Sequence, residues 1–273
     1  MAFAIDNLTN VKAHWSADQI TGSPSDGTAV SSLPDSISGW TLSGSGTTRP
    51  IYKTTAGPNG LPSILFDGTD DYLQTASKLL TINNVAMALV GSFTLKDYNT
   101  HLYLTTLSGV PGYSANTSRI YNLCYSTGKG LSGTGNGSAN CYQLSNSIIP
   151  SATKFLWTSF HSKGTNLLRI NGASVTHNAD SGAIVDASIS STTLYANLGR
   201  SDLAGSYLQG YVSEIVLWDE TVLCESAYIE GVLAAKYGIT LPTNHPFYSG
   251  SPASGPATGA SGFSLSRLIN LGG

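Results

Sequence analysis

Short runs of apolar and β-branched residues recur along the chain, and Gly, Asn, Asp, Ser and Pro separate them. Two turn signals, a loop at Ser162–Asn166 and the pair Asn171–Gly172, indicate hairpins. The pattern therefore predicts an all-β protein. Seven runs have the length and composition of strands: SILFDG (63–68), VAMALVGSFTL (85–95), HLYLTTL (101–107), FLWTSFHS (155–162), NLLRING (166–172), TLYANLG (193–199) and GYVSEIVLWD (210–219).

One segment has the spacing of a helix instead, from Cys224 to Gly238. Gly238 is a natural C-terminal stop, and Pro242 lies just beyond it. Many short strands, one late helix and no alternating β–α units predict two antiparallel sheets packed face to face. The predicted apolar side of the helix consists of Ala227, Ile229, Leu233, Ala234 and Tyr237.

The composition changes near the C-terminus, which divides the chain into a domain (1–243), a linker (244–261) and an arm (262–273). The linker is rich in Pro, Gly, Ser and Ala and has little to bury. The arm is apolar again but too short to form its own core, so it is expected to dock on its own domain, a sister chain or a scaffold. The docking residues would be Phe263, Leu265, Arg267, Leu268, Ile269 and Leu271.

Charge and hydropathy exclude several classes of partner. Only 11% of the 273 residues are charged and the formal net charge is −3, so nucleic acid is not an expected partner. No apolar run approaches the roughly 20 residues that span a bilayer, so no membrane partner is expected either. The first ten residues lack the features of a secretory signal. We therefore expect the protein to act in the cytoplasm or to leave the cell without such a signal.

Cys124, Cys141 and Cys224 form an odd set with no metal-binding spacing. Free, mostly buried thiols are the expected state. A Cys124–Cys141 bridge across the Gly/Ser-rich loop between them is the alternative.

Four segments stand out along the chain: Trp15–x–Ala–Asp18, Asp35–x–x–x–Gly39, NGLPSILFDGTDDYLQ (59–74) and the closing stretch that ends in AAKYGI (234–239). Together they resemble the concanavalin A-like lectin/glucanase superfamily, in its laminin-G-like jelly-roll branch. The resemblance implies a two-sheet antiparallel jelly-roll sandwich with one short C-terminal helix, followed by an extended C-terminal arm. This branch occurs in bacterial surface proteins and phage virion proteins, and its members include lectins, adhesins, enzymes and structural modules.

A glycoside hydrolase needs two carboxylates about 5–9.5 Å apart. On an extended strand Glu214 and Glu220 would lie roughly 20 Å apart, and Glu225 and Glu230 belong to the predicted helix. No Ser lies in the G-x-S-x-G motif of a nucleophile elbow. His161 lies on a predicted strand and is interpreted as a half-exposed sheet residue, not as a catalytic base. The chain is therefore expected not to be an enzyme.

The stretch FDGTDDYLQ (66–74) concentrates three carboxylates. Asp67 and Gly68 read as a tight turn, with Asp67 accepting bonds from nearby backbone N–H groups and Asp70 doing the same at the next bend. Tyr72 and Leu73 would then enter the sheet. The alternative is a calcium site at Asp70 and Asp71, since calcium prefers several carboxylate oxygens. No cofactor other than this calcium is expected.

Sugar binding needs an exposed aromatic platform with amides or carboxylates beside it. A Tyr- and Asn-rich segment between the third and fourth predicted strands has this composition, and loops of such folds carry recognition. The alternative is that these tyrosines cap the sheet or pack on a neighbouring chain, while Trp15, Trp40, Trp157 and Trp218 are core. The tentative carbohydrate-binding residues are Tyr113, Asn116, Tyr121, Asn122, Tyr125 and Tyr142.

Two functional hypotheses follow. In the first, the chain is a non-enzymatic virion structural protein, a phage decoration, fibre or tail-associated protein on the virion surface. It would display a lectin-like domain to cell-surface glycans, and its arm would bind other virion proteins or sister chains in a homo-oligomer. In the second, it is a free-standing lectin or adhesin of a bacterium. The phage attribution rests on the family resemblance.

Overall fold

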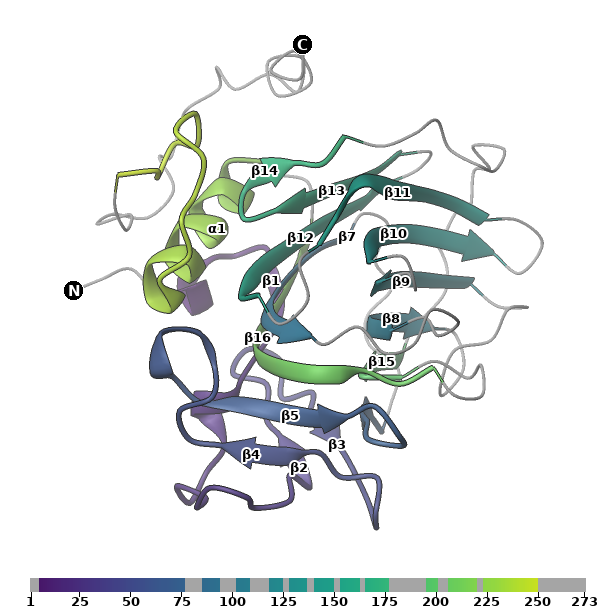
Figure 1. Ribbon diagram of the computed structural model, residues 1–273, viewed down its shortest axis with the longest axis vertical. Helices are drawn as coiled ribbons and strands as arrows, with labels where there is room; N and C mark the ends of the chain where they lie inside the picture. Colours follow the sequence, from purple (N-terminus) through teal and green to yellow (C-terminus); the bar gives the residue numbers. More distant parts are fainter. Residues whose placement is uncertain are drawn as a thin grey trace.

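The computed structural model describes residues 5–76, 85–93, 102–108, 118–124, 128–136, 140–149, 153–162, 165–176, 195–200, 206–219 and 223–249. Within these ranges the chain forms two eight-stranded antiparallel sheets (Figure 1). Sheet A contains β1 (Val11–Ser16), β4 (Ile51–Lys53), β5 (Ser63–Asp67), β7 (Val85–Phe93), β12 (Phe155–Ser162), β13 (Thr165–Ile170), β14 (Ala173–Ser174) and β16 (Gln209–Asp219). Sheet B contains β2 (Ser32–Leu33), β3 (Leu42–Ser43), β6 (Leu73–Thr75), β8 (Leu102–Ser108), β9 (Ser118–Cys124), β10 (Lys129–Asn136), β11 (Asn140–Ile148) and β15 (Tyr195–Leu198).

The two sheets enclose one apolar core, which confirms the two-layer sandwich predicted from the sequence. Trp15, Trp157 and Leu89 lie in this core, and Trp40 packs against it while partly buried. All seven predicted strand runs coincide with strands. Asn171 and Gly172 have φ values of 51° and 77° and form the predicted tight turn between β13 and β14.

Strand β16 joins the two ends of the chain in sheet A. It pairs with β7 along one side, while its other side pairs first with β5 and then with β1. A bulge between Val212 and Glu214 separates these two halves. The N-terminal strand therefore lies beside Glu214, 200 residues away from His14 in sequence.

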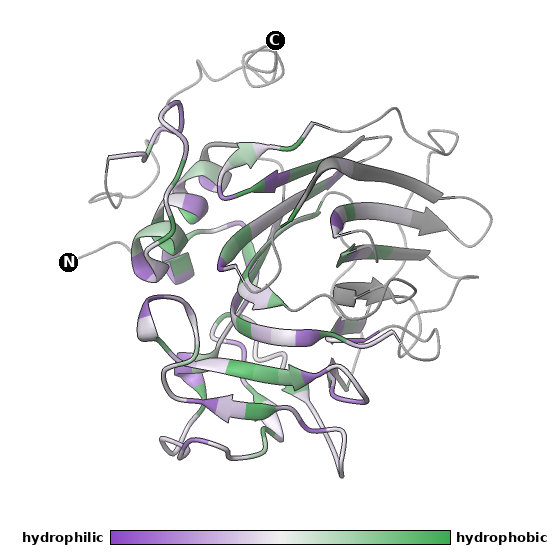
Figure 2. Cartoon of the chain, in the orientation of Figure 1, coloured by the Kyte–Doolittle hydropathy of each residue, from purple (hydrophilic) through white to green (hydrophobic). Residues whose placement is uncertain are grey.

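Helix α1 (Leu223–Tyr237) packs on the face of sheet A turned away from sheet B (Figure 1). Ala86, Ala88 and Val90 of β7 contact it, whereas Met87 and Leu89 between them face the core, so β7 is apolar on both faces. Hydrophobic and hydrophilic residues alternate around α1 (Figure 2). Gly238, with φ +61°, ends the helix as predicted. Short 3-10 helices are η1 (Ile5–Asn7), η2 (Ala17–Gln19) and η3 (Pro58–Gly60). None of the helices described has the length and hydropathy needed to cross a membrane.

The Gly-, Ser-, Tyr- and Asn-rich segment was predicted as a recognition loop, and this is wrong for most of it. The segment contributes β9, β10 and β11, which pair in register in sheet B. The small residues have a packing role, because a Cβ added at Gly130 would lie 2.8 Å from the Trp157 ring. Strand propensity of Gly and Ser is low, so the contact with a large core side chain overrides it here.

The folded domain extends beyond residue 243, which corrects the predicted start of the linker. His245 is buried, and its Nε2 lies 3.1 Å from the carboxylate of Glu230 on α1. Arg169 of β13 also binds Glu230, at 2.9 Å. Phe247 packs on α1 at Tyr228 and Gly231. Residues 244–249 are therefore held to α1, and the predicted arm at 262–273 lies outside the described residues.

Cys124 is a free, buried thiol, and burial raises its pKa to about 12. The register places Cys124 opposite Gly130 but Cys141 opposite Thr134 in the same strand, β10. Gly130 and Thr134 lie four positions apart along β10, so the two cysteines are not opposite each other and the alternative Cys124–Cys141 bridge is wrong.

Candidate functional site

The three aspartates of the acidic stretch converge at the turn after β5. Asp67 Oδ1 accepts hydrogen bonds from the backbone N–H groups of Thr69 and Asp70, at 2.7 and 3.4 Å. This confirms Asp67 as the residue that holds the turn. A third bond of this kind involves Asp71, whose Oδ2 accepts from the backbone N–H of Asp67 at 2.9 Å. The prediction had given that role to Asp70.

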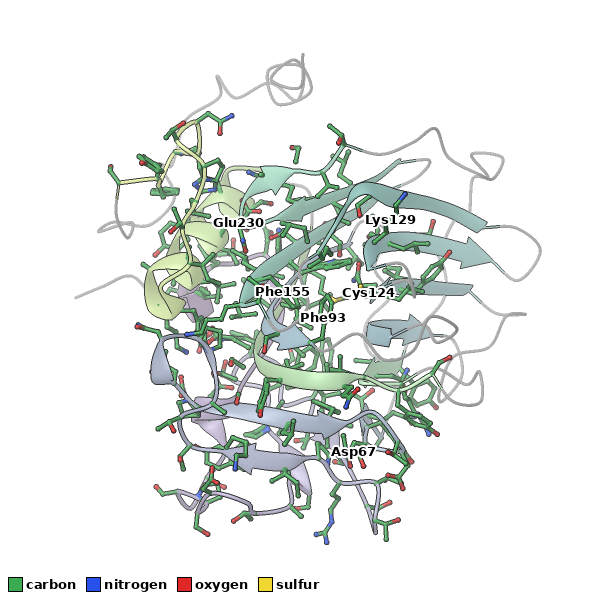
Figure 3. All side chains as sticks on the ribbon, in the orientation of Figure 1. Asp67, Phe93, Cys124, Lys129, Phe155 and Glu230 are labelled. Atoms are coloured by element: carbon green, nitrogen blue, oxygen red, sulfur yellow. The ribbon has the colours of Figure 1, made fainter. Side chains whose placement is uncertain are left out.

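The turn gathers negative charge that hydrogen bonds only partly compensate. One carboxylate oxygen from each of Asp67, Asp70 and Asp71 lies within 4.8 Å of the others. Asp71 is buried, Asp70 is half-buried and Asp67 is exposed at the edge of the molecule (Figure 3). Burial raises the pKa of Asp71 to about 6. The hydrogen bond from the backbone of Asp67 opposes this shift, and the neighbouring charges of Asp67 and Asp70 add to it.

A stacked tyrosine and arginine lie directly beside this turn. The guanidinium carbon of Arg200 lies 3.6 Å from the centre of the Tyr72 ring, and its Nη2 donates to Gln74 at 2.7 Å. Gln209 pairs with Asp67 across the strands and packs on Gly68. We call this group the acidic corner, which consists of Asp67, Asp70, Asp71, Tyr72, Gln74, Arg200 and Gln209.

The three carboxylates fit the calcium ion that the sequence offered as an alternative. Calcium binds oxygens at 2.3–2.6 Å, so two ligands of one ion lie at most about 5 Å apart. The 4.8 Å limit found for Asp67, Asp70 and Asp71 satisfies this condition. Three side chains supply only part of the six to eight oxygens that calcium takes, and water would supply the rest. The calcium site stays a prediction.

Calcium at about 10 mM is expected to raise the melting temperature by about 2–4 °C, because relief of the carboxylate repulsion stabilises the folded state by roughly 1–2 kcal/mol. Asp70→Asn should abolish this shift, whereas Asp26→Asn, at an exposed ion pair with Lys53, should not. The shift should also fade below pH 6, where Asp71 becomes protonated. Differential scanning calorimetry measures it, and an equal shift in wild type and Asp70→Asn excludes the ion.

Two of the predicted sugar-binding residues, Asn122 and Tyr121, are buried and so do not belong to an exposed platform. Asn122 is 1% exposed; it accepts from Trp157 Nε1 at 3.1 Å and donates to the Met87 sulfur at 3.5 Å. Tyr121 is 6% exposed. For these two residues the prediction is corrected, because strand β9 places them within the fold.

The other members of that set are only partly located. Gly133 of β10 pairs with Tyr121 on one side and with Tyr142 on the other, so the register brings these two positions into one cross-strand row. Tyr113, Asn116 and Tyr125 lie outside the described residues. His161, predicted as half-exposed, is buried between the sheets, 3.3 Å from Ser132 Oγ and 3.1 Å from Ser159 Oγ.

A buried ionic network around Glu214 was not predicted from the sequence. Glu214 is 2% exposed. Its Oε1 lies 2.8 Å from His14 Nε2, and its Oε2 accepts from Lys236 at 2.5 Å, Tyr237 at 2.7 Å and Ser16 at 3.2 Å. The network joins the two motifs of the resemblance, Trp15–x–Ala–Asp18 and AAKYGI, since Lys236 also binds Asp18 at 2.7 Å.

Charge complementarity favours the ionised forms of Glu214, His14 and Lys236. Burial would raise the pKa of Glu214, but the hydrogen bond from His14 and the charges of Lys236 and His14 outweigh it and lower the pKa to about 2. Burial would lower the pKa of His14, yet Glu214 and Asp6 raise it. Burial likewise opposes the charge of Lys236, and Glu214 and Asp18 raise its pKa. A Glu held so firmly is a structural residue rather than a proton donor.

A small hollow lies between α1 and the segment that follows it. Its volume is about 210 Å³, below the 300–1,000 Å³ typical of small-molecule sites. It is lined by Gly231, Ala234, Ala235, Ile239, Thr240, Leu241, Phe247 and Tyr248. These side chains offer few polar groups, so the acidic corner is the better candidate for ligand binding.

No protein-family model and no curated protein sequence matches the chain. Among solved structures it is similar to domain 4 of the extracellular arabinanase AbnA from Geobacillus stearothermophilus, in complex with arabinotriose (15% identity, 77% of this chain and 92% of that chain, TM-score 0.48). It is also similar to a heptameric SAP-like pentraxin from Limulus polyphemus (13% identity, 71% and 88%, TM-score 0.47). The two packed antiparallel sheets and the late helix agree with the two-sheet sandwich and single C-terminal helix that the sequence resemblance implied.

Proposed function

We propose that this chain is a non-enzymatic, lectin-like module that binds carbohydrate at the acidic corner. The observation that carries the proposal is the convergence of three carboxylates, an arginine–tyrosine stack and two glutamines at one edge of the sandwich. Carboxylate, amide and guanidinium groups are the partners of sugar hydroxyls, and a half-buried aromatic ring provides a flat apolar surface. Few precisely placed polar groups around an aromatic side chain are typical of such a site.

The described glutamates support a binding role over hydrolysis. Glu214 is bonded to four side chains, and Glu230 is buried against Arg169 and His245. Glu225 is buried in the first turn of α1, and burial raises its pKa although the Asn10 side chain lowers it. Each of these three glutamates is engaged within the fold, so none of them is placed to serve in the carboxylate pair that hydrolysis needs.

A glycan array tests the proposal directly. The wild-type chain is expected to bind one class of glycan, and Tyr72→Ala should reduce binding about fivefold or more, because stacking contacts of an aromatic ring are worth about 1 kcal/mol or more. Tyr248→Ala is the matched control, since Tyr248 is an exposed tyrosine that lines the hollow beside α1 instead. Absence of glycan binding by the wild-type chain, or equal binding by both variants, would exclude the proposal.

A finer proposal places this module on the surface of a virion, where it would display its glycan site. It rests on the family resemblance and on the apolar residues of the arm, such as Phe263 and Leu268, which lie outside the described residues. Deletion of residues 262–273 should leave the domain folded and abolish its assembly into particles or oligomers. Normal assembly of the truncated chain would favour the free-standing lectin or adhesin instead.

A further inference from the structure

Both ring nitrogens of His14 face carboxylates. Nδ1 contacts Asp6 Oδ1 and Nε2 lies 2.8 Å from Glu214 Oε1. A neutral imidazole has a single N–H, so it can donate to only one of these oxygens and must turn a lone pair toward the other. Only the imidazolium satisfies both contacts. The geometry therefore makes His14 a proton-binding position between two elements of the chain.

The charged groups around His14 favour the proton from several sides. Asp6 comes from η1 and Glu214 from β16, while Asp35 accepts the backbone N–H of His14 at 2.8 Å. The groups on α1 and η2 interact with Glu214 or with its partner. Lys236 and Tyr237 of α1 bind Glu214, and Asp18 of η2 binds Lys236. Burial of the ring opposes the proton, but the two carboxylates outweigh it and the pKa of His14 is raised.

The two carboxylates differ in what they can do when the proton leaves. The side chain of Glu214 is 2% exposed and that of Asp6 is 37% exposed. Water can solvate Asp6 but not Glu214, so the remaining N–H stays on Nε2 and Asp6 faces the lone pair of Nδ1. Loss of the proton therefore breaks the Asp6 contact and spares the Glu214 contact.

Asp6 belongs to a short segment, residues 5–8, that covers apolar surface. Ile5 and Leu8 are buried in the same apolar cluster as Trp218 of β16 and Tyr228 of α1. Apart from these apolar contacts, the Leu8 N–H donates to the Ile5 carbonyl within the segment itself, at 3.0 Å. Among the described residues, the Asp6–His14 ion pair is thus the polar contact that fastens this segment to the sheet.

We propose that His14 is a proton-controlled latch: its imidazolium fastens residues 5–8 over α1 and β16, and its deprotonation releases them and uncovers the apolar surface beneath. A group whose pKa is higher in the folded state stabilises that state fully below its unfolded pKa, about 6.5 for His, and loses this effect as pH rises through the folded pKa. Release is therefore expected above pH 6.5, as pH rises through the raised pKa of His14.

Hydrogen exchange on the full chain tests the latch, with each amide rate divided by its intrinsic rate at pH 6 to 9. In the wild type, protection of residues 5–8 should fall about tenfold as pH rises, while that of β7 stays constant. In Asp6→Asn, protection of residues 5–8 should be low throughout and independent of pH. Asp26→Asn, which removes an exposed carboxylate elsewhere, should behave as the wild type.

Two results would overturn the latch. One is constant protection of residues 5–8 in the wild type from pH 6 to 9. The other is the same pH dependence in Asp6→Asn as in the wild type, which would assign the effect to another group. The His14 imidazole resonances in NMR spectra give the titration independently, and Asp6→Asn should lower the pKa that they report.

Discussion

Replacement of Glu214 by glutamine is expected to destabilise the folded chain by about 3 kcal/mol, the lower end of what is lost when one partner of a buried ion pair is removed. The amide keeps the volume of the side chain but leaves His14 and Lys236 without their shared counter-charge. The loss is not larger because Lys236 keeps Asp18 and His14 keeps Asp6. Urea denaturation at pH 7 measures it.

Asp18→Asn is the matched control, because it makes the same chemical change at the solvent end of the network. Asp18 is 36% exposed, so its ion pair with Lys236 is expected to contribute less than about 1 kcal/mol. The stabilisation that Glu214 provides should also depend on pH. Since the pKa of Glu214 is lowered to about 2, its stabilising contribution is present above pH 4.5 and is lost as pH falls toward 2. A loss for Glu214→Gln no larger than that for Asp18→Asn would mean that the buried contacts of Glu214 add no more stability than the surface ion pair does.

Gly91→Ala is expected to cost about 3 kcal/mol, the upper end of typical overpacking effects. Gly91 lies in β7, between β12 and β16, and opposes Val212. A Cβ at this position would lie 2.3 Å from the backbone carbonyl oxygen of Tyr211. Backbone cannot rotate away as a side chain can, so β7 and β16 would have to separate in the middle of sheet A. Thermal and urea denaturation measure the loss.

The control for this substitution is Gly44→Ala, just after β3. At Gly44 the atom nearest to an added Cβ is the end of the Leu73 side chain, at 3.0 Å. This side chain can move by a few tenths of an ångström. We expect a loss of about 1 kcal/mol or less. If Gly91→Ala is no more destabilising than Gly44→Ala, then close approach of β7 and β16 does not limit substitution at Gly91.

Strong local patterns made much of the fold predictable. The continuous apolar run at β7 and the capped apolar pattern of α1 needed no tertiary information, since burial on two faces and Gly238 are visible in the sequence. Strands β9–β11 were missed because Gly and Ser are weak strand formers. What makes Gly130 fit a strand is the Trp157 ring against it, a contact from a residue 27 positions away.

The site was predictable only where its contacts are local. Asp67 could be identified as a turn residue because its partners, Thr69 and Asp70, follow it directly. The stack of Arg200 on Tyr72 joins residues 128 positions apart, and no sequence signal connects them. The Glu214 network likewise joins both ends of the chain. The sequence contained one signal for this network, the two motifs of the family resemblance that hold its residues. These motifs were interpreted as packing residues and not as partners in an ionic network.

The central claim, glycan binding at the acidic corner, is tested most directly by an NMR titration of the full chain with the glycan selected on the array. The amides that shift should cluster at residues 67–74, 199–200 and 207–209, with calcium present. Shifts that cluster on β9 and β11 around Tyr121 and Tyr142, or no shifts at saturating glycan, would contradict the claim.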